Sequence, residues 1–548
     1  MKTRFREVDE SLLSFMFICS GPSTGEDAID AAIGLAGIGK FTWKIIAINS
    51  LILINAGFTT NSISLIFPAS ACDFNLTTMD QGVMTATPFL GMIVGSYFWG
   101  CLADLHGRKY ALVIALASQG LFELSSSLVS NFWGYIFFKF LSGFSLIAQN
   151  AIVYPFVGEF QPVTLRKKVL CALEIAWVLG TIALPALGWL IIPLNVSYTT
   201  NYFFFHSWNL FVFLSSLLAP TLALWLMTFP ESPKYLAEQG EDAELAKALE
   251  IMHSENTGES FDAFLRKLTD NGLDDLRMRL ELKESRSAKG NYSKHERAQK
   301  LFKDVIRNTG TLFRPPFLKQ TLLICVLWYC VASTFFSFTM WFPELVRRLE
   351  AFETMFPGES AWVCSAAPAG NSTIVDSTSK CSPNIPNEVF QHTLILGAAC
   401  LPTNILVPLF VNKLGYKFFL VLSSGVAMAV TVGLFFVESS TQNLILSSTY
   451  EGFLSISSAL VLVVITELYP TQIRATASSL GVLIGRIGSV VGNLLMGHLI
   501  DNHCVTFIAS NIVQLIICTV VSLILPLKRK GERPVSNSVV TLVINEKI

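Results

Sequence analysis

Charged residues are scarce in this chain. Asp, Glu, Lys and Arg make up 14% of its 548 residues, whereas a soluble globular protein carries about a quarter. The net charge is −1, so the composition gives no reason to expect a nucleic acid partner. The chain lacks a Walker-type phosphate loop, and its 7 His form no metal-site spacing with Cys. We therefore expect neither an enzyme nor a metal or other cofactor.

Apolar residues dominate instead, at 52% of the chain, and the mean hydropathy is +0.53. Uninterrupted apolar runs recur, and a membrane-spanning helix needs about 20 such residues. Because backbone groups in lipid must be paired within the segment, each run predicts a helix. The sequence predicts an all-α membrane protein with twelve spans, at 41–69, 81–103, 110–130, 133–158, 169–191, 208–229, 319–343, 389–411, 418–437, 443–466, 475–499 and 505–527.

Basic residues in the short loops predict the orientation. They alternate between loops, and the loops around Asp73 and Asp501 have almost none. The positive-inside rule places the basic loops, and with them both termini, in the cytosol. The basic set is Arg108 and Lys109, Arg166 to Lys168, Lys413 and Lys417, Arg474, and Lys528 to Lys530.

Glycosylation sequons agree with this orientation. Asn75, Asn195 and Asn371 each begin an Asn-x-Ser/Thr sequon on the predicted outer side, and we expect glycans there. Asn291 falls on the inner side and should carry none.

Two long loops divide the chain. Residues 230–318 hold 31 of its 79 charged residues, so they form a predicted cytosolic linker, with a short amphipathic helix at 243–252. Residues 344–388 form an outer loop, in which Cys364 and Cys381 are expected to make a disulfide. The predicted organisation is a cytosolic tail at 1–40, a six-helix half at 41–229, the linker at 230–318, a second half at 319–527 and a tail at 528–548.

The two halves contain an internal repeat at an offset of 308 residues. The loop after the second span recurs as the loop after the eighth span. The end of the fourth span recurs as the end of the tenth span. Parallel repeats of six helices are typical of transporters that bind substrate between the halves. The alternative is that both are ordinary charged turns. The matched pairs are Gly107 and Gly415, Lys109 and Lys417, Glu159 and Glu467, Pro162 and Pro470, Arg166 and Arg474, and Gly180 and Gly488.

These loops suggest gates. Gly107 permits a tight turn, Asp104 suits a helix end, and Arg108 and Lys109 hold the loop inside. A salt-bridged turn can hold two helices together in one state and release them in another. The alternative is a topology signal alone. We add four charged residues of the repeat, which can form latches at the cytosolic face, namely Glu159, Arg166, Glu467 and Arg474.

Ionisable residues deep in the spans are candidates for function, because they are costly in lipid. Arg486 lies near the middle of the eleventh span and Glu123 near the middle of the third. Arg486 can bind an anionic group of a substrate. The alternative is an internal ion pair with Glu451 or Glu123.

Three aromatic residues join Arg486 and Glu123 as candidate substrate-binding residues. Tyr154, Trp177 and Tyr450 lie in predicted spans. Trp and Tyr are also enriched at lipid interfaces, so packing is the alternative reading.

Several motifs resemble a known family. Gly100-x-x-x-Asp-x-x-Gly-Arg-Lys109, Pro230-Glu-Ser-Pro-Lys-Tyr235 and Glu467-Leu-Tyr-Pro-Thr-x-x-Arg474 are similar to the sugar-porter and organic-ion branch of the major facilitator superfamily. Three further motifs resemble the synaptic vesicle glycoprotein 2 family and its relatives, namely Phe205-His-Ser-Trp208, Trp341-Phe-Pro-Glu344 and Phe356-Pro-Gly-Glu359. The resemblance implies the major facilitator fold, two pseudo-symmetric halves of six helices.

The chain also departs from that family. Two acidic residues usual in the first span are Ala56 and Thr59 here, and a Trp and an Asp of the tenth span are Ser458 and Leu462. The outer loop is about 45 residues rather than a large domain. Trp177 and the basic residue at 486 are kept. These losses leave proton coupling through the first span without its carboxylates.

Two functions remain open. The first is a secondary transporter of a small organic solute, an anion or a zwitterion, with a small-molecule substrate and the lipid bilayer as partners. The second is a non-transporting membrane receptor or vesicle trafficking protein on a transporter scaffold. Retained motifs favour the first and the missing acids the second. Either function places a multi-pass protein in the plasma membrane or a vesicle membrane.

Overall fold

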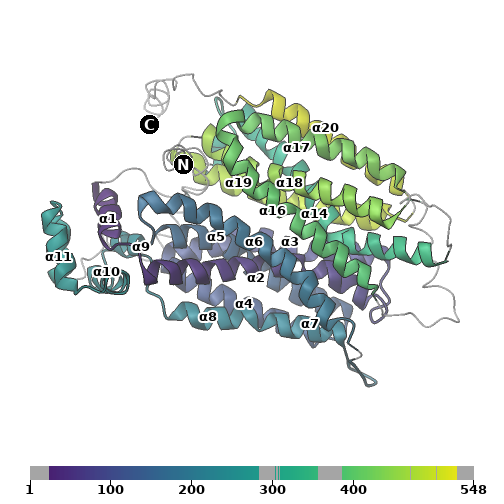
Figure 1. The fold of residues 1–548 in the computed structure, drawn as a ribbon, viewed down its shortest axis with the longest axis horizontal. Coiled ribbons are helices and arrows are strands. Elements are labelled where there is room, and N and C mark those ends of the chain that lie inside the picture. The colour runs from purple at the N-terminus through teal and green to yellow at the C-terminus, as the bar shows by residue number, and fades with distance from the viewer. Residues whose placement is uncertain are drawn as a thin grey trace.

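The computed structural model describes residues 24–282 except 195, residues 303, 306, 307, 309–355 and 364, and residues 385–526 except 438, 470 and 502. Its long helices lie side by side in one bundle (Figure 1). The first half contains α2 (Lys40–Ser70), α3 (Thr78–His106), α4 (Arg108–Ser127), α5 (Phe132–Gly158), α6 (Val163–Ile191), α7 (Ser207–Ser216) and α8 (Leu218–Met227).

The second half contains α14 (Leu318–Met355), α16 (Asn387–Leu414), α17 (Tyr416–Gly433), the 3₁₀ turn η2 (Leu434–Phe436), α18 (Ser440–Leu468), α19 (Thr471–Leu499) and α20 (Cys504–Ile524). A short hairpin of β1 (Ser197–Thr199) and β2 (Phe204–His206) pairs Ser197 with His206. Smaller helices lie at the other end of the bundle, namely α1 (Thr24–Leu35), α9 (Pro233–Gln239), α10 (Asp242–Thr257), α11 (Phe261–Asp270) and α12 (Asp274–Leu282). α10 covers the predicted linker helix.

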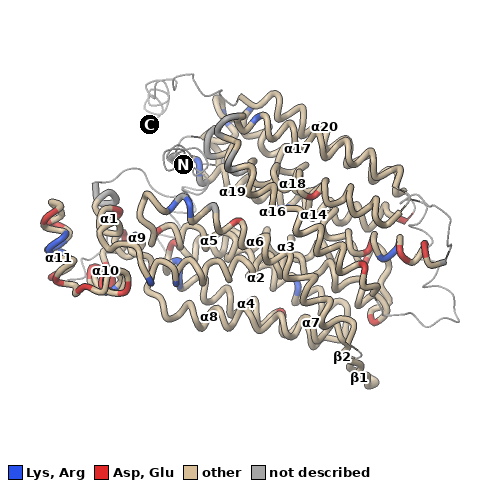
Figure 2. The backbone as a smooth tube through the Cα atoms, in the orientation of Figure 1, with Lys and Arg blue, Asp and Glu red and all other residues tan. Residues whose placement is uncertain are grey.

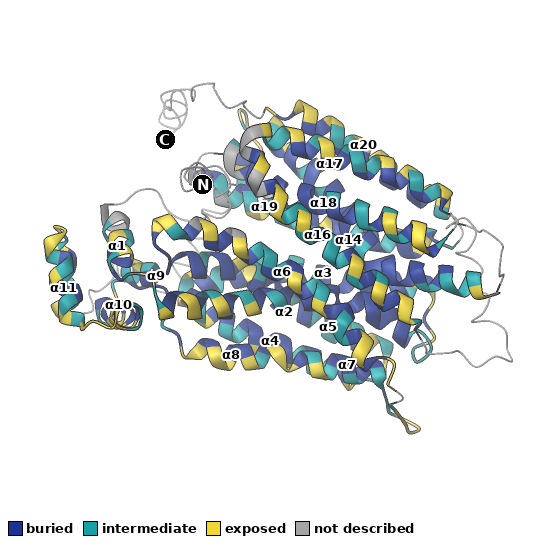
Figure 3. Ribbon diagram, in the orientation of Figure 1, coloured by how far each residue is buried: buried dark blue, intermediate teal, exposed yellow. Residues whose placement is uncertain are grey.

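We name the two ends of the bundle by these features. The linker end carries α1, α9, α10 and α11, and the hairpin end carries β1 and β2 (Figures 1 and 2). Charged residues gather at the two ends and in the small helices, with few along the middle (Figure 2). Exposed residues face outward from the long helices while buried ones lie between them (Figure 3). This distribution suits a bundle surrounded by lipid.

Eleven helices among the described residues are long and apolar enough to cross a membrane. The sixth of the predicted spans is broken at Leu217 into α7 and α8. The third predicted span corresponds to α4, which is not among the eleven because residues such as Gln119 and Glu123 lower its hydropathy. α4 nevertheless packs against α5 and α8 within the first half.

Helix pairing repeats between the halves. In the first half α2 packs on α6, α3 on α5, α4 on α5, and α4 on α8. In the second half α14 packs on α19, α16 on α18, α17 on α18, and α17 on α20. The halves meet along α3 against α19 and α6 against α16, which are equivalent pairs under the repeat. The predicted all-α fold of two repeated halves is therefore confirmed.

Two pairs of glycines repeat as well. Gly107 and Gly415 end α3 and α16 with φ values of 103° and 82°, which side chains rarely adopt. Gly180 and Gly488 allow close helix contact, because an added Cβ would lie 2.2 Å from the Ile54 oxygen or 2.4 Å from the Tyr329 oxygen. The repeated residues thus hold equivalent places in the packing.

Polar side chains start several helices. Thr77 and Asp80 form a reciprocal capping box at the start of α3, with Asp80 Oδ2 accepting from the Thr77 backbone at 3.0 Å. Asn131 caps α5 through the Trp133 amide, and Ser439 caps α18.

Candidate functional site

Arg486 lies on α19, where the two halves meet. Its guanidinium carbon is 5.7 Å from the ring centre of Phe89 on α3 and 5.3 Å from that of Phe336 on α14. These rings come from different halves, and their faces attract a cation. Nη1 of Arg486 is buried and has no hydrogen-bond partner among the described residues. The side chain therefore points into the seam between the halves.

Neither carboxylate considered as an internal partner contacts Arg486. Glu123 lies between α4 and α5, where it pairs with Lys139 Nζ at 2.7 Å and accepts a hydrogen bond from Ser142 at 2.6 Å. Glu451 on α18 is bonded to the Thr339 hydroxyl of α14 at 2.5 Å. The structure thus places Glu123 away from Arg486, in an ion pair inside the first half.

The three aromatic candidates lie in two separate places. Tyr450 is buried on α18, with its ring 4.6 Å from that of Phe338 and its hydroxyl donating to the Thr334 carbonyl at 3.3 Å. Tyr154 on α5 is bonded to Glu174 of α6, one helical turn from Trp177. Tyr450 therefore belongs to the second half, and Tyr154 and Trp177 belong to the first. The sequence did not identify Phe89, Phe336 or Thr339, which have no motif of their own.

A neutral network occupies the middle of the first half. Asn55 donates to Gln119 at 3.0 Å and to Gln149 at 2.9 Å, and Gln149 donates to Gln119 at 2.8 Å. Gln119 in turn donates to the Thr59 hydroxyl at 3.1 Å. Ala56 and Thr59 stand where the related family has acidic residues, so amides and a hydroxyl, rather than carboxylates, fill this region.

The predicted gating loop is held at the linker end by residues far away in sequence. Glu231 accepts hydrogen bonds from the backbone of Lys109 at 2.9 Å and of Tyr110 at 3.3 Å, so it caps α4. Arg108 pairs with Glu159 at 3.1 Å, and the Ser232 hydroxyl donates to the same carboxylate. The sequence did not assign this capping role to Glu231.

Burial is the main influence on the pKa of Glu159. It raises the pKa of this carboxyl to about 7, although Arg108 and Ser232 both act to lower it. Asp104, by contrast, is exposed on the last turns of α3. Arg108 is thus paired within the first half, while the Lys109 backbone is bonded to the start of the linker.

Arg166 has a partner that the sequence did not indicate. Its Nη2 lies 2.5 Å from Asp30 of α1 and donates to the Gln161 carbonyl at 3.2 Å. Lys234 also pairs with Asp30, at 2.8 Å. The α1 helix is therefore joined by charge to both α6 and α9. Burial acts to raise the pKa of Asp30, but hydrogen bonds from Arg166 and Lys234 outweigh it and hold this pKa below its usual value.

The repeated arginine is arranged in the same way. Arg474 donates to the Tyr469 carbonyl at 3.2 Å, five residues back, as Arg166 does to Gln161. The side chain of Glu467 lies outside the described part of the structure.

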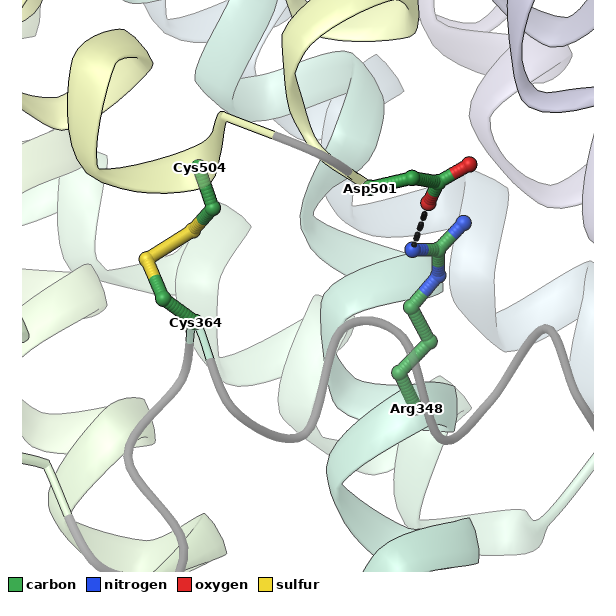
Figure 4. The surroundings of a disulfide bond; sticks show 4 residues. All are labelled: Arg348, Cys364, Asp501 and Cys504. Atoms are coloured by element: carbon green, nitrogen blue, oxygen red, sulfur yellow. Dashed lines mark hydrogen bonds and ion pairs between the residues drawn. A yellow bond between two sulfur atoms is a disulfide. The ribbon is translucent and has the colours of Figure 1, made fainter.

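The expected disulfide between Cys364 and Cys381 is wrong in its pairing. Cys364 bonds to Cys504 at the start of α20 (Figure 4). The start of α20 lies close to Cys364 in the fold, with a Cα separation of 5.5 Å, although 140 residues separate the two in sequence. Cys381 lies outside the described residues. Cys72 is also disulfide-bonded.

Beside this disulfide, a polar chain connects the halves. Arg348 of α14 pairs with Asp501 at 2.8 Å (Figure 4) and with Glu344 at 2.8 Å. Asp501 also accepts a hydrogen bond from Thr78 of α3, in the first half, at 2.5 Å. Glu344 belongs to the Trp341-Phe-Pro-Glu motif, so this motif helps to hold the hairpin end together.

Asn75 is exposed in the turn before α3, with a positive φ of 50°. Asn195, Asn291 and Asn371 lie outside the described residues. Asp73, in the same turn as Asn75, accepts hydrogen bonds from Trp208 Nε1 at 2.6 Å and lies 2.8 Å from His206 Nδ1. The Phe205-His-Ser-Trp motif thus fixes this turn.

Two family models match the chain. Residues 33–288 match the sugar (and other) transporter family, and residues 391–541 match the major facilitator superfamily. Synaptic vesicle glycoprotein 2B of Mus musculus is 30% identical over 331 residues, which are 59% of this chain and 47% of the relative. Synaptic vesicle glycoprotein 2A of Homo sapiens is 28% identical over 339 residues, which are 60% of this chain and 46% of the relative. The match spans less than half of each relative.

Solved structures share the fold. The xylose transporter XylE from E. coli, in a partially occluded inward-open conformation, gives a TM-score of 0.60 at 14% identity, covering 90% of this chain and 99% of that one. The inward-open conformation of the same transporter also gives a TM-score of 0.60, at 15% identity, and covers 90% of this chain and 98% of that one.

Two repeated helical halves that meet along a seam define a multi-pass membrane protein with a transporter fold. Both family models and these relatives support a major facilitator protein, a sugar-porter relative of the synaptic vesicle glycoprotein 2 proteins. The resemblance drawn from the motifs is confirmed.

Proposed function

We propose that this protein is a secondary transporter of a small organic anion or zwitterion, and that Arg486 binds the anionic group. One observation carries the proposal. The Arg486 guanidinium lies in the seam between the halves, held by aromatic rings from both, and no described carboxylate contacts it. A cation in this position is expected to serve a function, because it is costly to bury without a partner. Transporters of this architecture bind substrate between their halves.

Other residues complete the proposed site. Tyr450 lies beside α14, as Arg486 does, and Tyr154 and Trp177 supply aromatic surface in the first half. The ion pair with Lys139 supports a structural role for Glu123 instead.

We further propose that the linker end is cytosolic and acts as a gate. The predicted gating set is Asp104, Gly107, Arg108, Lys109, Glu159, Arg166, Glu467 and Arg474. In this conformation Arg108 pairs with Glu159 of the first half, the Lys109 backbone donates to Glu231 at the start of the linker, and Asp104 is exposed. At the opposite end, Thr78 and Asp501 join the halves. This arrangement supports an inward-facing state, in which the hairpin end is closed.

The test is uptake by the full chain in proteoliposomes. The panel is acetate, succinate, glutamate, carnitine and glucose. We expect uptake of a carboxylate or zwitterion, abolished by Arg486→Ala and partly retained by Arg486→Lys, which keeps the charge but not the bidentate geometry. Lys44→Ala, at an exposed ion pair with Glu255, is the matched control and should transport normally. Uptake of glucose alone, or normal uptake by Arg486→Ala, would contradict the proposal.

A non-transporting receptor or trafficking protein is the second candidate. The neutral network around Asn55 and Gln119 favours it, since its described hydrogen bonds are made by amides and a hydroxyl. Absence of uptake for the whole panel, from protein that remains folded, would support this candidate.

A further inference from the structure

Glu451 is a buried carboxyl group, and among the described residues no cation contacts it. It lies on α18, in the second half, and is 2% exposed. Its Oε1 is 2.5 Å from the Thr339 hydroxyl, while its Oε2 is buried and has no hydrogen-bond partner among the described residues. In the first half, Glu123 has Lys139 to compensate its charge, and Glu174 is bonded to the Tyr154 hydroxyl.

The two short oxygen contacts of Thr339 bear on the protonation state of Glu451. The Thr339 hydroxyl lies 2.8 Å from the Phe335 carbonyl as well as 2.5 Å from Glu451. A hydroxyl has one hydrogen but can also accept, whereas a carbonyl only accepts. If Thr339 donates to Phe335, the hydrogen between Thr339 and Glu451 must come from Glu451. A protonated carboxyl satisfies both short contacts, and an ionised one leaves one of them without a hydrogen.

The groups around Glu451 do not offset a negative charge. The titratable groups that face it are the Cys400 thiol of α16 and the Tyr450 hydroxyl of α18. α14 contributes the Thr339 hydroxyl, and we find no contact with Glu451 from a charged residue of α17, α19 or α20 within the described part of the chain. An isolated carboxylate in such surroundings is costly, and the group takes up a proton instead.

We propose that Glu451 is a proton-binding site and that the proton it carries is the coupling ion of this transporter. The carboxylic acid form exists in the conformation described here, and the proton leaves to water as the halves rearrange, so that Glu451–COOH becomes Glu451–COO⁻ and H⁺. The coupling part of this inference rests on the proposed function, whereas the proton site does not.

The position of Glu451 relates it to Arg486. Phe336 of α14 contacts the Arg486 guanidinium, and Thr339, one turn further along the same helix, holds Glu451. A movement of α14 that accompanies anion binding at Arg486 therefore also changes the surroundings of Glu451. In the first half, the region of Thr59 and Gln119 holds neutral groups.

Infrared spectroscopy of the full chain tests the proton site without any substrate. A protonated carboxyl has a carbonyl stretch that is separate from the bands of a carboxylate. Glu159 and Glu174 can contribute to the same stretch. We expect this stretch at pH 7 in the wild type, the loss of one component of it in Glu451→Gln, and the persistence of that component in the matched variants Glu159→Gln and Glu174→Gln. Thr339→Val, which removes the hydrogen-bond partner, should shift the band and so assigns it even if Glu451→Gln fails to fold. If neither Glu451→Gln nor Thr339→Val alters the band, the proposal is wrong.

Transport then tests the coupling. With the carboxylate of the panel that has the highest rate, acidifying the side of entry should make wild-type vesicles accumulate it several-fold. Glu451→Gln should lose this accumulation while equilibrium exchange, which needs no net proton movement, persists. If Glu451→Gln accumulates the carboxylate as much as the wild type does, Glu451 does not couple protons to transport. If wild type transports no member of the panel, the proposed function fails, and the infrared titration still decides the proton site.

Discussion

The Glu123–Lys139 ion pair allows a quantitative prediction about stability. Both side chains are nearly inaccessible, at 6% and 2% exposure for Glu123 and Lys139, and their charged atoms are 2.7 Å apart. Lys139→Met keeps the length of the side chain but removes its charge. Glu123 is then left with one hydroxyl, that of Ser142, as its partner. Removing one member of a buried pair in this way costs about 3–5 kcal/mol of unfolding free energy.

Replacing both members should cost less than the sum of the single changes. In Lys139→Met/Glu123→Gln no buried charge is left, and Gln keeps the hydrogen bond with Ser142. We expect a total cost of about 1–2 kcal/mol, from lost hydrogen bonds, and thus a coupling energy of several kcal/mol. The control is Lys44→Met, at an ion pair whose side chains are 53% and 36% exposed, which should cost less than about 1 kcal/mol.

Equilibrium unfolding of Lys139→Met, Glu123→Gln, the double variant, Lys44→Met and the wild type, in SDS with mixed micelles, measures these energies. If Lys139→Met costs no more than Lys44→Met, or if the two changes in the buried pair are additive, the structural role assigned to Glu123 is wrong.

Three further predictions concern the two ends of the bundle. Because the pKa of Asp30 is lowered in the folded state, its contribution to docking of α1 is present above its unfolded pKa and is lost as pH falls through the lowered value. Hydrogen exchange of α1 should therefore increase in acid and should already be fast in Asp30→Asn, and slow exchange in that variant would contradict the contact with Arg166. Peptide mapping without reduction should recover Cys364 linked to Cys504, also in Cys381→Ser, and a Cys364–Cys381 peptide would refute the pairing. Mass spectrometry should find glycans at Asn75, Asn195 or Asn371, and a glycan on Asn291 would reverse the predicted orientation.

Hydropathy and repetition were sufficient to predict the fold. Runs of apolar residues have to form helices in lipid, so their positions follow from composition. The glycines at 107 and 415 recur because the same helix junction recurs, and the arginines at 166 and 474 make the same bond to the backbone. Local patterns of this kind carry their own structural meaning.

Partners that come from distant segments could not be predicted in this way. Asp30 meets Arg166 across 136 residues and Glu231 meets Lys109 across 122, and no spacing rule relates these positions. Cys364 pairs with Cys504 for the same reason, since the sequence does not tell which loops meet at the hairpin end.

The Glu123–Lys139 pair is different, because its signal was local. α4 ends at Ser127 and α5 begins at Phe132, so the two helices form an antiparallel hairpin with a short turn. Residues at similar distances from such a turn face each other. A glutamate and a lysine near its two sides could have been paired from the sequence.

Arg486 is proposed to recognise an anionic group between the halves. The most direct measurement compares the binding of one transported carboxylate with that of its uncharged amide, in the wild type and in Arg486→Ala. A charge-assisted hydrogen bond contributes about 1.5–3 kcal/mol, so the wild type should prefer the carboxylate by roughly 10- to 100-fold, and Arg486→Ala should bind both ligands equally weakly. An equal preference for the carboxylate in the wild type and in Arg486→Ala would show that another residue binds the anion.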